Sequence, residues 1–127
     1  MHAIRLIALD LDGTLLDDEK RLSKENRAAL TEAAEAGVLL VPATGRYFEG
    51  IPAVLREQPF LRYCITINGA AIYDAVEKRT LHRAEISLPE AERVWDYMET
   101  LPVIYDCYQR DRGWMDAGFY PKIDEFT

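Results

Sequence analysis

The segment RLIALDLDGTLLDDE, residues 5–19, constrains the fold of this 127-residue chain more than any other feature. The apolar run that begins at residue 4 and ends at Asp10 is typical of a strand buried on both faces of a parallel sheet. Asp12 follows two positions later. Side chains two apart on an extended chain point the same way, and two carboxylates on one side are costly unless a cation lies between them. The segment therefore predicts a buried strand that ends on two carboxylates, and it raises the question of which cation offsets their repulsion.

An alternation of helices and strands follows the two acids. Ser23 is a predicted helix N-cap, Gly37 ends that helix, and the next elements expected are a strand over residues 38–45, a helix over 46–58 and a strand over 63–68. An order of strand, helix, strand, helix, strand predicts an α/β fold with parallel strands and right-handed crossovers.

Polar residues stand at the end of every predicted strand. Thr44, Gly45 and Arg46 end the second strand, and Asn68 and Gly69 end the third. Ligands of parallel sheets bind at the carboxyl ends of the strands, so we expect these residues and the two acids to share one site. Ordinary structural roles stay open at this point: a helix N-cap for Thr44, a surface position for Arg46, and a hairpin turn for Asn68–Gly69.

After residue 69 the pattern changes. Residues 70–86 alternate as a β-hairpin does. Ser87 and Glu90 form a predicted capping box that begins a helix, and two β-rich stretches follow over residues 103–109 and 113–120.

Composition argues against several classes of function. The formal net charge is −7, which argues against a nucleic-acid partner. Cys64 and Cys107 show no framework or zinc-ligand spacing, which favours a reducing compartment and no zinc site. The apolar residues before Asp10 are too few for a signal peptide or a membrane span. We therefore expect a cytoplasmic protein with no membrane partner.

Asp10 and Asp12 allow several interpretations. A calcium-binding EF-hand is excluded, because Arg21 stands where the loop needs its last acid. A glycosidase pair is unfavourable, because acids on one strand end do not flank a sugar. Solvated turn residues stay open. Phosphoryl transfer also fits: Mg²⁺ takes carboxylate oxygens, one Asp attacks phosphorus, a second moves the proton, and Gly13 allows a sharp turn toward a phosphate.

Three motifs resemble one known family. DLDGTLL at residues 10–16, ATGR at 43–46 and TINGA at 66–70 resemble signatures of haloacid dehalogenase superfamily phosphatases, in the Cof-like branch with a type IIB cap. The resemblance implies a Rossmann-like parallel sheet core, here residues 1–84, followed by the beginning of an α+β cap, residues 85–127. It also implies a Mg²⁺-dependent hydrolase acting on small phosphorylated metabolites such as sugar phosphates.

Carried over by position, the resemblance implies that Asp10 is the nucleophile and a magnesium ligand. Asp12 is then the general acid/base, and its main-chain carbonyl also binds the metal. Thr44 would hydrogen-bond the transferring phosphoryl group. The residues implied around the phosphate and pocket are Gly13, Thr14, Gly45, Arg46, Asn68 and Gly69.

Two family signatures are not found in this chain. The family uses a lysine after the cap and a GDxxND-like acidic loop, and no GD pair occurs in the sequence. Members of the branch are roughly twice as long, so we expect this chain to correspond to an N-terminal portion that is inactive alone and that self-associates through an open sheet edge. A sugar phosphomutase and a non-catalytic phosphate- or cation-binding module remain alternatives. A receiver-like phosphate acceptor leaves ATGR and NGA unexplained.

Overall fold

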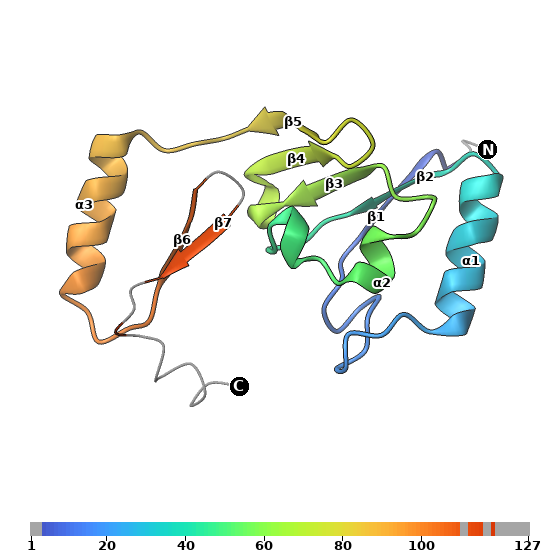
Figure 1. Cartoon of the computed structure of the whole chain (residues 1–127), viewed down its shortest axis with the longest axis horizontal. Helices are drawn as coiled ribbons and strands as arrows, with labels where there is room; N and C mark the ends of the chain where they lie inside the picture. The colour runs from blue at the N-terminus through green and yellow to red at the C-terminus, as the bar shows by residue number, and fades with distance from the viewer. Residues whose placement is uncertain (1–3, 110–111, 116–117, 119–127) are drawn as a thin grey trace. The chain divides into compact units, whose positions relative to one another are not determined.

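A computed structural model describes residues 4–109, 112–115 and 118 (Figure 1). The chain divides into two compact units, Met1–Ala84 and Glu85–Thr127, and each is described by itself.

The first unit begins with a parallel β–α–β element. Strand β1 (Leu6–Leu9) pairs in parallel with β2 (Leu39–Pro42), and helix α1 (Lys24–Glu35) connects them (Figure 1). The Ser23 hydroxyl oxygen accepts a hydrogen bond from the Asn26 amide at 3.0 Å, so Ser23 is the predicted N-cap. Gly37 follows the helix with φ +83°, a conformation that favours glycine.

A second, three-stranded sheet adjoins the end of β2. Strand β3 (Tyr63–Thr66) lies parallel to the end of β2 through a bridge between Ala43 and Ile65. Strands β4 (Ala71–Asp74) and β5 (Arg79–Arg83) then follow as antiparallel neighbours. The expected α/β fold with parallel strands is confirmed, and so is the hairpin after the third strand.

The region expected as one helix over residues 46–58 is not continuous. It forms a short 3₁₀ turn, η1 (Phe48–Gly50), and a single helical turn, α2 (Ala53–Arg56). Pro52 explains the interruption, because proline has no N–H to donate and disfavours helical backbone at the residue before it. Ile51 is accordingly extended, with ψ 130°.

The first strand is not buried on both faces, and that prediction is wrong for the described residues. Leu6 is 52 % exposed, whereas Ile7 and Leu9 pack against the core. That core is a cluster of mostly leucine side chains, among them Leu40 of β2 and Leu55 of α2. It covers only one face of β1, which leaves alternate side chains outside.

The loop over residues 13–22, called the 13–22 loop below, connects β1 with α1. Leu15, Leu16 and Leu22 anchor it in the core, and Leu16 forms an antiparallel bridge with Leu22. The loop is therefore a small hairpin with a buried base and an exposed tip.

The second unit contains α3 (Leu88–Glu99) and the antiparallel pair β6 (Asp106–Gln109) and β7 (Arg112–Met115). The predicted capping box is present, since the Ser87 amide donates to Glu90 Oε2 at 3.1 Å. Part of the stretch predicted as β-rich over residues 113–120 lies outside the described residues. No helix within the described part of the chain is both long and apolar enough to cross a membrane.

Candidate active site

Asp10 and Asp12 lie directly after β1, with the fully buried Leu11 between them. Both acids are exposed. The Thr14 hydroxyl donates a 2.7 Å hydrogen bond to Asp10 Oδ2. Gly13 has φ +72°, so the chain turns in a conformation that favours glycine. The turn directs the amides of residues 14–16 to the Leu11 carbonyl oxygen, at 2.8–3.3 Å. Local sequence therefore places both carboxylates outside the core.

Asp12 is held by two cationic side chains. Arg46 Nε donates to Asp12 Oδ2 at 2.8 Å, and its Nη2 donates to Oδ1 at 2.9 Å. Lys20 Nζ donates to the same Oδ1 at 2.9 Å. The Arg46 hydrogen bonds, and after them the one from Lys20, hold the pKa of the Asp12 carboxyl well below its usual value. Asp12 is therefore ionised at neutral pH.

Lys20 is a site residue that the sequence reasoning missed, because Arg46 was the one nearby cation it identified. The turn-forming run DDEK before buried Leu22 was the available signal for a chain reversal. That signal does not give the direction of the lysine side chain, which depends on the left-handed backbone at Lys20, φ 60°.

The Thr44–Arg46 segment joins the strand end of β2 to the same site. Thr44 is buried, and its amide donates to the Ile65 carbonyl oxygen at 3.0 Å. Its Oγ1 accepts a hydrogen bond from the Arg46 amide at 3.2 Å. Thr44 is not a helix N-cap, because η1 begins only after Tyr47. Arg46 is not an ordinary surface residue either, since it contacts Asp12 and also the Gly50 carbonyl oxygen at 3.0 Å.

Asn68 and Gly69 form the turn between β3 and β4, with φ values of 52° and 95°. The turn is also tied to the β2 end, because the Asn68 amide donates to the Thr44 carbonyl oxygen at 3.1 Å. A Cβ atom on Gly45 would lie 2.9 Å from Asn68 Oδ1, so glycine permits the close approach. The three strand ends are thus linked, by Arg46 between the first and second and by this turn between the second and third.

The site fits a magnesium ion with few protein ligands. Within the described residues no group of three or more His, Cys, Asp or Glu side chains could hold a metal. Both Asp12 carboxylate oxygens are engaged by cations, whereas Asp10 makes its hydrogen bond to Thr14 through Oδ2. Mg²⁺ usually takes one or two carboxylates and keeps several waters, so a site with a single available carboxylate is compatible with this metal.

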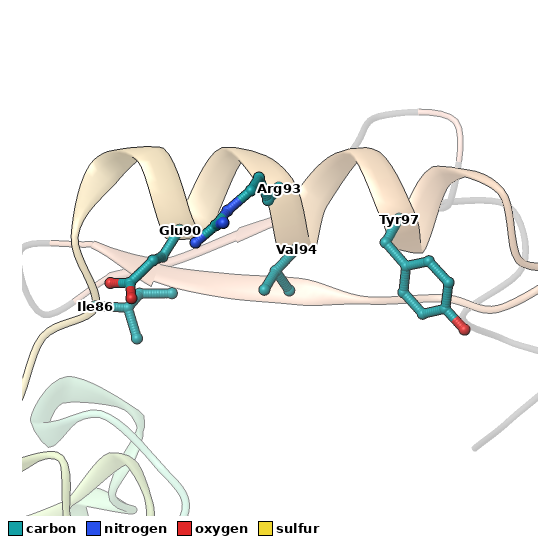
Figure 2. Close-up of a pocket in the computed structure, with 5 residues that line it drawn as sticks. All are labelled: Ile86, Glu90, Arg93, Val94 and Tyr97. Carbon is teal, nitrogen blue, oxygen red and sulfur yellow. The ribbon is translucent and has the colours of Figure 1, made fainter.

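A hollow also lies along α3 in the second unit. It is about 510 Å³ in volume and is lined by Ile86, Glu90, Arg93, Val94 and Tyr97 (Figure 2). Glu90 is committed to the capping box, and no residue predicted for the phosphoryl-transfer site lines this hollow. We therefore place the candidate site at the strand ends of the first unit.

Comparison with known proteins identifies the family. The sequence pattern of the haloacid dehalogenase-like hydrolases matches residues 7–126. The chain belongs to this family. It is 39 % identical over 97 residues to 5-amino-6-(5-phospho-D-ribitylamino)uracil phosphatase YcsE of Bacillus subtilis, covering 73 % of this chain and 37 % of the relative. It is 32 % identical over 105 residues to phosphatase YwpJ of the same organism, covering 83 % and 36 %.

Solved structures of haloacid dehalogenase-like hydrolases share the fold. One from B. subtilis superposes with a TM-score of 0.83 at 29 % identity, over 96 % of this chain and 42 % of that one. One from Bacteroides thetaiotaomicron gives 0.76 at 26 % identity, over 97 % and 47 %. In sequence, the chain spans little more than a third of the length of the curated relatives YcsE and YwpJ.

Proposed function

We propose that this chain carries the nucleophile-bearing part of a Mg²⁺-dependent phosphatase that hydrolyses small phosphorylated metabolites, such as sugar phosphates, through an aspartyl-phosphate on Asp10. The observation that carries the proposal is the exposed pair Asp10 and Asp12 after β1, one oriented by Thr14 and the other held by two cations. The phosphatase names of relatives support the reaction class.

Asp10 is the nucleophile in this proposal. The Thr14 hydroxyl engages Oδ2 and so fixes the carboxylate, which leaves Oδ1 to attack phosphorus. A bond forms between Oδ1 and phosphorus, and the ester P–O bond breaks. Water then attacks the phosphorus of the aspartyl-phosphate, the bond to Asp10 breaks, and inorganic phosphate leaves.

Asp12 moves the protons of both steps. It gives a proton to the leaving ester oxygen and later removes one from the attacking water. In the ligand-free site its cations keep it ionised, which suits the second role. A bound phosphate dianion adds negative charge beside the same cations, and this raises the pKa of Asp12 toward the range in which it holds a proton.

Thr44 and the turn residues form the proposed phosphate cradle. Because the Thr44 hydroxyl oxygen accepts its hydrogen bond from the Arg46 amide, its own hydrogen remains to donate to a phosphoryl oxygen. Gly13 and Gly45 add main-chain amides without side-chain bulk. Asn68 and Gly69 would line the pocket beside them, and the Asn68 side chain already approaches Gly45 so closely that a Cβ there would lie 2.9 Å from its Oδ1.

Mg²⁺ would be held by the Asp10 carboxylate and the Asp12 carbonyl. When bound it neutralises charge on the phosphoryl group. We further interpret residues 1–84 as part of the catalytic core and residues 85–127 as the beginning of an α+β cap. A reducing, cytoplasmic location is in keeping with Cys64 and Cys107, which are both free.

Phosphoryl capture tests the proposal without requiring complete turnover. The chain is incubated with Mg²⁺ and acetyl phosphate, whose leaving group needs little protonation, and the phosphorylated residue is located by mass spectrometry. We expect one phosphoryl group on Asp10, none in Asp10→Asn, and normal capture in Asp18→Asn, a control acid exposed in the same loop.

Three results separate the alternatives. No capture by the wild-type chain would contradict the proposal that this chain carries a working nucleophile, and it would favour a non-catalytic binding module. Capture followed by transfer to a second position on a sugar phosphate would favour a phosphomutase. Release of inorganic phosphate that is slowed in Asp12→Asn supports hydrolysis with Asp12 as the base.

A further inference from the structure

Lys20 joins the tip of the 13–22 loop to Asp12. Its ammonium shares Asp12 Oδ1 with Arg46 Nη2, each at 2.9 Å. Arg46 comes from the segment after β2, whereas Lys20 comes from the loop that follows the acids themselves. The Asp12 carboxylate therefore contacts both segments, and Lys20 is its contact with the tip of the 13–22 loop.

The tip of this loop is built to present residue 20. The Lys20 amide donates to the Asp17 carbonyl oxygen at 2.9 Å, and the Asp17 amide donates to the Arg21 carbonyl oxygen at 3.1 Å. This is a short hairpin turn, and Lys20 occupies a left-handed position, φ 60°, at which glycine is usual in such turns. A lysine there brings a long cationic side chain back over the start of the loop.

The left-handed backbone alone does not mark a function. Lys78, in the turn between β4 and β5, has nearly the same conformation, φ 51°. Unlike Lys20, Lys78 makes no ion pair with another described residue. The ion pair with Asp12 is thus the feature that distinguishes Lys20.

We propose that Lys20 is a positioning residue for Asp12, which latches the exposed tip of the 13–22 loop onto the carboxylate that moves protons in the reaction. The inference rests on the proposed function, because it assigns Lys20 a part in the same site. The base of the loop is fixed by its buried leucines, so the ion pair governs only the tip, residues 17–21. Without Lys20, Asp12 keeps its two hydrogen bonds to Arg46 but loses its contact with the loop tip.

Amide hydrogen exchange of the intact 127-residue chain tests the latch directly. We expect Lys20→Met to raise the exchange rates of tip amides about two- to fivefold, the factor that an exposed ion pair supports. Lys20→Arg should restore protection, and 1 M salt should remove most of the difference between wild type and Lys20→Met. Lys78→Met is the matched control and should leave the tip unchanged. Unchanged tip exchange in Lys20→Met would overturn the proposal.

The lifetime of the aspartyl-phosphate tests the link to the reaction. After labelling with acetyl phosphate, we expect Lys20→Met to hold the phosphoryl group about two- to fivefold longer than wild type, because Asp12 is less well placed to activate water. Lys20→Arg should return the lifetime toward wild type. An unchanged lifetime with a loosened tip would show that Lys20 is structural only. If the wild-type chain accepts no phosphoryl group, the proposed function fails. Amide hydrogen exchange alone then tests whether Lys20 holds the loop tip.

Discussion

Replacing Arg46 with methionine should destabilise the first unit, because it removes the side-chain contacts between Asp12 and the segment after β2. Methionine keeps an aliphatic stem but cannot donate the two hydrogen bonds to Asp12 or the one to the Gly50 carbonyl oxygen. Hydrogen bonds to charged groups contribute about 1.5–3 kcal/mol when well buried. The Arg46 and Asp12 side chains are 34 % and 37 % exposed, so solvent screening lowers this contribution. We expect the free energy of unfolding to fall by about 2 kcal/mol in total, with the hydrogen bond to the Gly50 carbonyl included.

Urea unfolding followed by circular dichroism measures this loss. With a slope of about 1–2 kcal/mol per molar urea, the midpoint should fall by about 1–2 M. Arg46→Lys should recover only part of it, because a lysine cannot make the forked contact. Lys20→Met, which removes one exposed ion pair, should cost less than about 1 kcal/mol. A loss below about 0.5 kcal/mol in Arg46→Met would refute the reasoning that the ion pair holds the strand ends together.

The ion pair between Asp12 and Arg46 also determines the direction in which the stability of the fold changes with pH. The pKa of Asp12 is lower in the folded chain than its ordinary value of 3.8, because Arg46 and Lys20 stabilise the carboxylate. The pair therefore stabilises the fold fully above about pH 4, and this stabilisation is lost as the pH falls below 3.8. The stability difference between wild type and Arg46→Met should be constant from pH 7 to 5 and should narrow at pH 3. A difference that grows on acidification would contradict this sign.

Further expected outcomes concern glycine, cysteine, the sheet edge and activity. Gly69→Ala should cost more than Gly45→Ala in urea unfolding, because Gly69 has φ +95° whereas the clash at Gly45 is relieved when the exposed Asn68 side chain rotates. Cys64 should resist alkylation at pH 8, because burial raises the pKa of its thiol to about 12. The exposed Cys107 should react, and equal labelling rates for the two thiols would contradict the burial of Cys64. Leu6→Lys should weaken any self-association through β1 in sedimentation, because charge on an edge strand opposes strand pairing, and an unchanged oligomer would place the contact elsewhere. The 127-residue chain should show no measurable turnover of an aryl phosphate with Mg²⁺, because two family signatures are not found in it. A turnover rate within tenfold of that of YwpJ, measured in parallel and lost in Asp10→Asn, would contradict this expectation.

The sequence by itself determined the features that depend on neighbouring residues. Apolar runs and turn residues predicted the parallel strands, Ser23 and Ser87 marked two helix starts, and the DLDGTLL and ATGR motifs indicated the family. These signals are readable because strand period, capping and glycine turns act within a few residues.

Only the tertiary structure decided which side chains meet at the strand ends. Arg46 reaches Asp12 across 34 positions, and Lys20 reaches it through a left-handed turn that residue types near position 20 do not require. The uncovered face of β1 likewise depends on which elements pack against it, since the same apolar run suits a strand covered on one face or on both. Contacts between residues far apart in the sequence follow from how the elements pack. A pattern of neighbouring residues does not specify which distant residue will pack against it.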